Sequence, residues 1–441
     1  MRLRLCGLKK ILAIVLAGST IAMSGCAAVR TGNTSKEQNH TKNEYSGEIT
    51  IWSWNNELVT SGIIDQFHEE YPDVYVNLVT IPNNNNSYST KLIATLRSGV
   101  CAPDIYLAES AVVRKLCNQK FYENLSTEQY QAEELAKEMM PYTVELGRND
   151  EDGSIRALTW QAAPGGFFYR RSLAKEYFGT DDPQKIQAMM STMDQLLDMG
   201  ETIKEKSNGS VSLLANYTEL FYVFLANREH GWCEDGKLVI DDSLYDYIKI
   251  AKQIRDNGYD CNAKQWTPAW SEAQADGSVF GFVLPTWGLS SVLQGNAPDT
   301  KGDWAFVRMP ASYYWGGSWI GMYSGSKNKD LSWLFIKYIT SDESFMKQYA
   351  MNTGDYVNNV NVANEISASE EGNNAFLNGQ NVYKEYTELV KDIDASIITE
   401  YDEVINNIWT MVMEKYINGE YDQDEMIRQF KQIVEERTGL K

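Results

Sequence analysis

Hydrophobic and polar residues alternate with two different periods along the first quarter of the chain. Residues 48–54 (EITIWSW) and 74–81 (VYVNLVTI) are short apolar and β-branched runs typical of β-strands. Between them, residues 56–71 place apolar side chains three and four positions apart, as on one helical face. Residues 87–99 predict a second helix and 103–109 a third strand. Alternating strands and helices predict an α/β fold with mostly parallel sheets, which bind ligands at the carboxyl ends of their strands.

The middle of the chain is less regular. Residues 157–169 (ALTWQAAPGGFFY) form two strand-like pieces around a Pro-Gly-Gly sequence, which indicates a chain crossing between two domains. Clearer helical patterns follow, and they predict four helices at 243–258, 330–340, 400–419 and 422–439. The last of these has Asp422 and Glu425 in a capping arrangement and ends at Gly439.

The N-terminal 25 residues have the order of a secretion signal. A basic start and a thirteen-residue apolar run precede Ser24, Gly25 and Cys26, and the run is too short to span a bilayer. The sequence MSGC resembles a bacterial lipobox, so we predict a lipoprotein signal peptide at 1–25 and a lipidated cysteine (palmitate) at Cys26. An ordinary secretory cleavage site is the alternative. Residues 26–46 continue as a polar segment and predict a flexible tether.

The charge of the chain argues against nucleic acid as a partner. The formal charge is −20, and it becomes about −24 without the four basic residues of the signal. A protein that binds a phosphate backbone needs a surplus of Lys and Arg on some face.

Four cysteines follow the tether, at positions 101, 117, 233 and 261. An even number outside the cell permits two disulfides, and proximity favours Cys101 with Cys117 and Cys233 with Cys261. Other pairings and free thiols remain open alternatives.

Most enzyme templates are missing. The chain has no glycine-rich cradle for a dinucleotide or for ATP, and GGSWIG at 316–321 fails the GxSxG pattern. Three histidines cannot build a zinc site of usual spacing, and the acidic turn NDEDG at 149–153 favours a solvated hairpin turn over calcium. We therefore expect no cofactor, no metal and no catalytic residues. Paired carboxylates for glycoside hydrolysis stay possible among sixty acidic residues, so a membrane-anchored surface glycoside hydrolase is the alternative function.

Aromatic residues at the ends of predicted strands point to sugar binding. A sugar presents flat C–H faces and a rim of hydroxyls, so its site needs aromatic plates with carboxylates and amides at their edges. Trp52 and Trp54 end the first strand on one expected face, and Glu109 ends the third, where an N-cap role is its alternative. The remaining candidates lie at the predicted crossing and in the later part of the chain, and together the ligand-binding candidates are Trp52, Trp54, Asn55, Glu109, Trp160, Gln161, Trp287, Trp315, Gly316, Gly317, Trp319, Tyr401 and Trp409. For Tyr401 and Trp409 a core role is the competing interpretation.

The chain resembles the family 1 extracellular solute-binding proteins of ABC importers, the group that includes maltose-binding protein. The segments that carry the resemblance are ITIWSWNNE, APDIYLAES, ALTWQAAPGGFFYRRSLAKEYF, GFVLPTWGLSSV and SKNKDLSWLFIKYITSDESFMKQYA. The resemblance implies a two-lobed periplasmic-binding-protein-like fold of type II, with lobe 1 at 47–159 and 308–340 and lobe 2 at 160–307 and 341–441.

The same resemblance implies a function. The expected protein captures a carbohydrate, an oligosaccharide, in a cleft between the lobes and delivers it to the permease subunits of an ABC importer. We expect a monomer held by its lipid anchor on the outer face of the cytoplasmic membrane. In the family, aromatic residues of the first strand, a polar edge after the PD strand and a tryptophan of the second lobe contact the sugar, which matches Trp52, Trp54, Glu109 and Trp287.

Overall fold

The computed structural model describes residues 45–83 and 87–441 of the chain. The predicted signal segment 1–25, Cys26 and nearly all of the predicted tether 26–46 lie outside the described residues, so lipid anchoring stays a prediction. No helix in the described part of the chain combines the length and the apolar character needed to cross a membrane.

The first of two main sheets has the strand order β2-β1-β3-β11-β4, with bounds β1 Gly47–Ser53, β2 Val74–Thr80, β3 Ile105–Glu109, β11 Ser318–Met322 and β4 Leu158–Thr159. β1 pairs in parallel with both β2 and β3, whereas β11 runs antiparallel to β3 and β4. Helices α2 Ile63–Glu70 and α13 Lys329–Ser341 pack together beside this sheet, where the rings of Phe67 and Phe335 meet at 4.8 Å. The predicted α/β class is confirmed.

The second main sheet is built around β5 Pro164–Arg170, with β8 Gly281–Pro285, β9 Trp304–Val307 and β10 Tyr313–Tyr314 paired to it. All three pairings are antiparallel, which differs from the expected mostly parallel arrangement. Parallel neighbours need a helical crossover between them. β5 instead comes directly from the first sheet and lies between its partners in the second, and all of these partners run antiparallel to it.

Two short segments carry the chain from one sheet to the other. Residues 160–163 lead from β4 into β5, as the run 157–169 indicated, and residues 315–317 lead from β10 back to β11. The Trp315 N–H donates to the Ala163 carbonyl at 3.2 Å, so the two crossing segments lie side by side.

The buried apolar residues form two clusters that meet at the second sheet. On β5, Phe168 belongs to the cluster that also fills the first sheet, while Phe167 and Tyr169 belong to the other cluster. The side chains of a strand alternate between its faces, so one strand contributes to both cores. The cluster of the first sheet includes buried residues of 345–395, and the other cluster includes those of 405–440.

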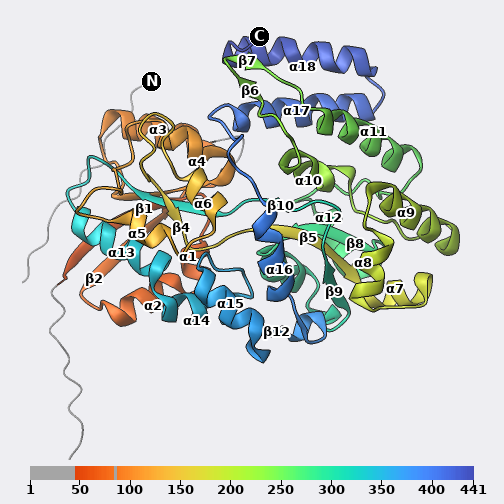
Figure 1. The fold of residues 1–441 in the computed structure, drawn as a ribbon, viewed down its shortest axis with the longest axis horizontal. Helices are drawn as coiled ribbons and strands as arrows, with labels where there is room; N and C mark the ends of the chain where they lie inside the picture. Colours follow the sequence, from red (N-terminus) through yellow and green to blue (C-terminus); the bar gives the residue numbers. More distant parts are fainter. Residues whose placement is uncertain (1–44, 84–86) are drawn as a thin grey trace, which may run out of the picture. The chain divides into compact units, whose positions relative to one another are not determined.

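The helices cover both sheets (Figure 1). In the first third of the chain, the helices not yet given are α1 Glu57–Thr60, α3 Ser87–Ser98, α4 Ser110–Cys117, α5 Ala132–Ala136 and α6 Pro141–Leu146. Those that follow are α7 Arg171–Phe178, α8 Pro183–Met189, α9 Met193–Ser207, α10 Phe221–Ala226, α11 Asp242–Asp256, α12 Pro268–Asp276, α14 Glu343–Thr353, α15 Val360–Ala368, α16 Tyr383–Leu389, α17 Asp402–Ile417 and α18 Gln423–Thr438. Two-residue strands form two small ribbons, β6 Cys233–Glu234 with β7 Lys237–Leu238, and β12 Asn373–Asn374 with β13 Gln380–Asn381.

The helices predicted from periodicity are present within a few residues. The last one has its predicted start and end, because the Asp422 carboxylate accepts the Glu425 N–H at 2.8 Å and Gly439 adopts the left-handed conformation. The single helix predicted at 56–71 is two helices, since Gly62, with φ of 77°, interrupts it between α1 and α2.

Candidate ligand-binding site

A cavity of about 770 Å³ lies against the two crossing segments, and its size is within the range of small-molecule sites. Its lining comes from both sheets, and comprises Trp54, Asn55, Asn56, Glu57, Thr60, Asn83, Glu109, Gln161, Tyr222, Gln265, Trp266, Trp287, Ser291, Trp315, Gly316, Gly317 and Ser318. Among the residues that the structure describes, no Lys, Arg or His lines it.

Aromatic rings line the side of the cavity that faces the second sheet. Tyr222 stacks on Trp315 with ring centroids 5.0 Å apart and planes 18° from parallel. Trp266 lies nearly parallel to Trp287 at 6.0 Å, and the Trp287 indole N–H donates to the Trp315 carbonyl at 3.0 Å. Trp266 is 62% exposed, so much of its surface is free to contact a ligand. These rings together present the flat apolar surfaces on which a sugar stacks.

Two glycines allow the backbone conformation of the second crossing segment. Gly316 and Gly317 have φ of 74° and 100°, a region that residues with a Cβ rarely adopt. A Cβ on Gly316 would lie 3.0 Å from the indole nitrogen of Trp287, and one on Gly317 would lie 3.0 Å from the ring of Trp319. Without a Cβ, the backbone at these glycines approaches tryptophan rings closely on both sides of the chain.

Polar groups line the side of the cavity that faces the first sheet. β1 ends at Ser53, whose hydroxyl accepts the Asn55 N–H at 3.2 Å, and this turn brings Trp54 and Asn55 to the cavity. Glu109 ends β3 and caps α4, because its carboxylate accepts the Ala111 N–H at 3.0 Å and the Ser110 hydroxyl at 2.7 Å. Burial raises the pKa of Glu109. The N-cap interpretation of Glu109 is confirmed, and its side chain also lines the cavity, while a contact with sugar hydroxyls stays a prediction.

Glu57 is a second carboxyl group in the lining, and a buried hydrogen-bond network lies behind it. Its oxygens accept from the Ser318 hydroxyl at 3.2 Å and the Tyr349 hydroxyl at 3.4 Å. The Tyr349 hydroxyl also reaches Asp355 at 3.0 Å. Burial, followed by the negative charge of Asp355, raises the pKa of Glu57 to about 7.

Gln161 joins this network from the first crossing segment. With its amide oriented to suit its neighbours, it donates to Asp355 and accepts the Ser318 N–H at 3.2 Å. Burial raises the pKa of Asp355 to about 6. The cavity floor is therefore a connected set of oxygens and amides that can both donate and accept hydrogen bonds.

The structure brings eight of the thirteen predicted ligand-binding residues to this one cavity. They are Trp54, Asn55, Glu109, Gln161, Trp287, Trp315, Gly316 and Gly317. That a ligand contacts them stays a prediction.

The structure places the other five predicted residues away from the cavity. Trp52 is 8% exposed with the Lys91 ammonium 5.4 Å from its ring centre, and it does not share a face with Trp54 because β1 has already ended at Ser53. Trp160 and Trp319 are buried in the core, and the Trp319 indole donates to the Thr143 carbonyl at 2.9 Å.

Tyr401 and Trp409 take the core role that was their alternative. Trp409 on α17 packs against Phe430 at 4.9 Å and Trp232 at 5.5 Å, with no exposed surface. Tyr401 precedes the first turn of the same helix and packs half-buried on that cluster.

Sequence reasoning missed several lining residues. Trp266 is the largest of them, and it has φ of 66°, a conformation that is costly for a bulky side chain and typical of functional positions. It directly precedes Thr267, the N-cap of α12, so a helix-start signal was present but no signal for a ligand. Glu57 and Tyr222 lie in helices whose exposed faces cannot be assigned to a cavity without the tertiary fold.

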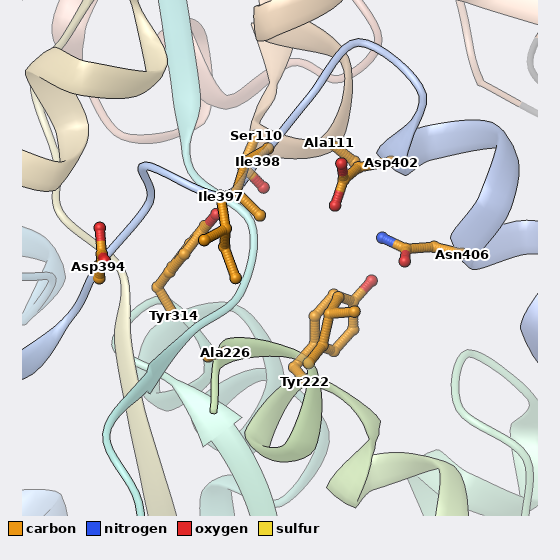
Figure 2. Close-up of a pocket in the computed structure, with 11 residues that line it drawn as sticks. Ser110, Ala111, Tyr222, Ala226, Tyr314, Asp394, Ile397, Ile398, Asp402 and Asn406 are labelled. Atoms are coloured by element: carbon orange, nitrogen blue, oxygen red, sulfur yellow. The ribbon is translucent and has the colours of Figure 1, made fainter. Parts of the chain in front are cut away.

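A smaller cavity of about 30 Å³ adjoins the first at Tyr222, which lines both (Figure 2). Asp402 and Asn406 of α17 face it from one side, and Ile397 and Ile398 from the segment before α17 close another. It has room for little more than a water molecule.

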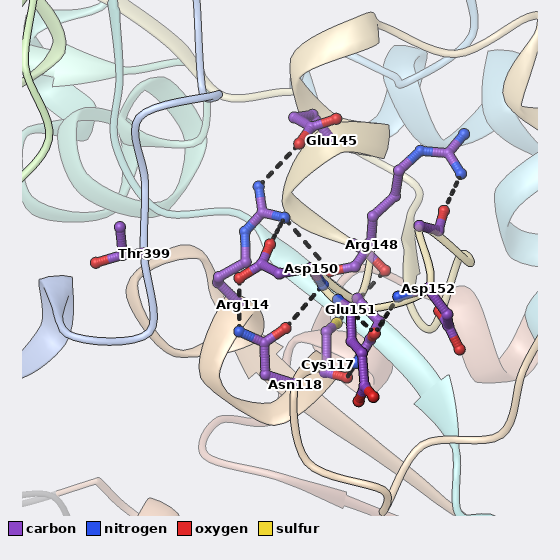
Figure 3. Close-up of polar contacts among 12 residues, drawn as sticks. Arg114, Cys117, Asn118, Glu145, Arg148, Asp150, Glu151, Asp152 and Thr399 are labelled. Carbon is purple, nitrogen blue, oxygen red and sulfur yellow. Dashed lines mark hydrogen bonds and ion pairs between the residues drawn. The ribbon is translucent and has the colours of Figure 1, made fainter. Parts of the chain in front are cut away.

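The acidic turn 149–153 is occupied by internal partners (Figure 3). Asp150 accepts from buried Arg114 at 2.7 Å and from Asn118 at 2.6 Å, and Asp152 pairs with Arg156 at 2.5 Å. Within 45–83 and 87–441, no group of three or more acidic, His or Cys residues is arranged to hold a metal ion. The four cysteines 101, 117, 233 and 261 are unpaired thiols, so neither favoured disulfide is present.

Comparison with known proteins places the chain among proteins that bind solutes outside the cell. Residues 62–375, more than two thirds of the chain, match the family model described as bacterial extracellular solute-binding protein. A solved structure titled extracellular solute-binding protein family 1 covers 88% of this chain and 99% of its own at 18% identity, with a TM-score of 0.74.

Two further solved structures come from bifidobacteria. The ABC transporter associated binding protein of B. animalis subsp. lactis, in complex with β-1,6-galactobiose, has a TM-score of 0.71 at 16% identity and covers 89% of this chain and 98% of its own. The galacto-N-biose/lacto-N-biose I-binding protein of Bifidobacterium longum, in complex with lacto-N-biose, has the same TM-score and identity over 90% and 98%. At this identity the likeness shows the fold, and it confirms the predicted two-lobed architecture.

Proposed function

The chain belongs to the bacterial extracellular solute-binding proteins, and from that premise we propose that it captures a carbohydrate in the cavity at the two crossing segments. The observation that carries the proposal is the cavity lining, in which aromatic rings oppose carboxyl, amide and hydroxyl groups and no basic side chain takes part. Stacking on C–H faces and hydrogen bonding to a rim of hydroxyls are the two interactions that a sugar offers.

The volume of about 770 Å³ supports a ligand of two or more sugar rings. Structural relatives solved in complex with β-1,6-galactobiose, lacto-N-biose and cycloalternan support an oligosaccharide as the ligand class. The proposed ligand contacts are the eight predicted residues at the cavity together with Glu57, Tyr222 and Trp266.

The remaining parts of the proposal concern the whole chain. We infer a lipoprotein signal at 1–25 and a lipid anchor on Cys26, which would hold a monomer at the outer face of the cytoplasmic membrane. We further infer two lobes, predicted as 47–159 with 308–340 and 160–307 with 341–441. Because β10 Tyr313–Tyr314 pairs with β5, the boundary predicted at 307/308 moves to the second crossing segment, 315–317. The loaded protein delivers its sugar to the permease of an ABC importer, and it acts without catalysing a reaction, because the family consists of binding proteins.

Thermal melting with a panel of sugars tests the proposal. Maltose, β-1,6-galactobiose, lacto-N-biose and cycloalternan are added to the chain from residue 27 onward. A sugar present at 100 times its Kd adds about 2.7 kcal/mol to the free energy of unfolding, so at least one should raise the melting temperature by several degrees.

Two results would contradict the proposal. If peptides or polyamines raise the melting temperature while no mono- or oligosaccharide does, the ligand class is wrong. If incubation releases reducing ends from an oligosaccharide, and Glu57→Gln or Glu109→Gln abolishes the release, the protein is a glycoside hydrolase.

A further inference from the structure

The hydroxyl of Tyr349 lies between two carboxyl groups. It is 3.4 Å from an oxygen of Glu57, which lines the cavity, and 3.0 Å from an oxygen of Asp355, which is buried behind it. A tyrosine hydroxyl has one proton and can donate it to one of these oxygens at a time. If both carboxyl groups were ionised, one of them would face a tyrosine lone pair instead of a donor.

The other partners of the two carboxyl groups show which one is ionised. Asp355 accepts from the Thr286 hydroxyl, from the Tyr356 N–H at 2.9 Å and from the Gln161 amide, in addition to Tyr349. Glu57 has fewer donors: the Asn55 side chain, the Ser318 hydroxyl, which can also accept, and Tyr349 at the longer distance of 3.4 Å. Donors therefore stabilise a negative charge on Asp355, and Tyr349 donates to it. The remaining proton belongs on Glu57.

The surrounding groups keep Glu57 about half protonated at pH 7. Burial and the charge of Asp355 raise the pKa of Glu57 to about 7, and the residues that face the pair contribute no positive charge. The carboxylate of Glu109 lies in the same cavity. The remaining titratable neighbours are tyrosines that stay neutral because burial raises their pKa values, namely Tyr142, Tyr349, Tyr383 and Tyr386.

We propose that Glu57 contacts the ligand as a neutral carboxyl group, and that binding of an uncharged carbohydrate takes up a proton at this residue. The inference rests on the proposed function and specifies its ligand class, because a site with two acidic groups and no basic one excludes anionic sugars such as uronates. A bound sugar replaces water around Glu57 without supplying a counter-charge, which disfavours the ionised form further. A cationic amino sugar would do the opposite and expel the proton.

The first test needs no ligand. Carbon-13 labelling of the glutamate side-chain carboxyls should show a resonance in the wild-type chain that titrates near pH 7 and is missing from Glu57→Gln. Buried Glu219, whose pKa is raised to about 8, should give a second high-titrating resonance that remains in this variant. The exposed carboxylate of Glu134 on α5 supplies a matched control, because Glu134→Gln should leave the Glu57 resonance unchanged. If the resonance that is missing from Glu57→Gln titrates below about pH 5 in the wild type, the resident proton does not exist and the inference fails.

The second test measures proton uptake with maltose and β-1,6-galactobiose. Calorimetry at pH 7 in two buffers of different ionisation enthalpy should give an uptake of up to about half a proton per site, since Glu57 is about half protonated beforehand. Affinity should fall roughly fiftyfold from pH 7 to pH 9 in the wild type. In Glu57→Gln, which keeps a neutral side chain of the same shape, both effects should disappear, whereas Glu134→Gln should retain them.

The outcomes separate this inference from the proposed function. Sugar binding without proton exchange, or with proton release, overturns the inference and leaves sugar capture intact. If neither sugar binds, the ligand class fails for the proposed function and for this inference. The carbon-13 titration then still decides whether Glu57 holds the proton.

Discussion

Asp402→Asn should cost several kcal/mol of stability, because it breaks the buried ion pair of Arg228 with Asp402. The two side chains are 0% and 2% exposed, and their nitrogen and oxygen lie 3.1 Å apart. Asp402, which also borders the small cavity in Figure 2, accepts the N–H and hydroxyl of Thr399 at 2.8 and 2.9 Å. One guanidinium nitrogen of Arg228 has no partner. The asparagine variant keeps the side-chain shape but leaves the Arg228 charge buried without compensation.

Removing one member of a buried ion pair costs about 3–5 kcal/mol. The lower end applies here, because Arg228 also donates to the Leu225 carbonyl at 2.8 Å and lies 5.2 Å from the Trp232 ring centre. With an unfolding entropy of about 2.1 cal/mol/K per residue over roughly 400 residues, ~3 kcal/mol lowers the melting temperature by about 4 °C.

Differential scanning calorimetry at neutral pH without ligand measures this loss. The control is Asp256→Asn on α11, which breaks an exposed pair with Lys252, where Asp256 is 55% exposed, and should cost no more than about 0.5 kcal/mol. If the two variants melt within 1 °C of each other, burial does not decide the strength of the Arg228 pair and the reasoning is refuted.

Three other outcomes follow from the same structure. Trp287→Ala should weaken binding of the tightest-binding panel sugar by roughly thirtyfold, as expected for an aromatic anchor of the site. Tyr245→Ala removes an exposed ring outside the cavity and should leave the affinity unchanged. Equal effects of the two variants in titration calorimetry would count against stacking on Trp287. The pKa of Glu57 is raised from 4.5 to about 7 in the folded chain, so its contribution to stability is intact below about pH 4.5 and is lost as the pH rises to about 7. Glu57→Gln should therefore gain stability over the wild type across that window, by at most ~3 kcal/mol before solvent screening, and a difference in melting temperature that does not change with pH would contradict this. A reducing agent should shift the melting temperature of the chain by less than about 1 °C because its four cysteines are free thiols, and a loss of several degrees would reveal a disulfide.

Local patterns were sufficient for the elements and for part of the site. The period of apolar residues at 422–439 and the cap at Asp422 determine α18 within the segment itself, and the structure agrees to a residue or two. Trp54 and Glu109 were predicted as site residues because each follows a strand, and the parallel pairing of β1 with β3 brings those strand ends to one edge. Trp52 was assigned by the same alternation, but the alternation stops where the strand stops.

The rest of the site depends on contacts between distant segments. Tyr349 is separated from Glu57 by 292 positions, so no local signal marks either as a partner of the other. The antiparallel second sheet was missed for a related reason. Local periodicity identifies strands but not whether they run parallel or antiparallel to their neighbours. Here β8 and β9 both run antiparallel to β5, which enters directly from the first sheet.

The position of the cavity links ligand binding to the relative orientation of the lobes. Gln161 and Trp315 lie on the two crossing segments that connect strands of the two main sheets, and both residues line the cavity. A ligand that touches them contacts the part of the backbone that must bend if the lobes move, while Trp54 and Trp287 contact it from opposite lobes. A ligand shifts a conformational equilibrium only by its difference in affinity for the two states. If the proposed ligand contacts Trp54 and Trp287 together, it binds more tightly in the orientation that brings both within reach, and the cavity would supply that difference in affinity.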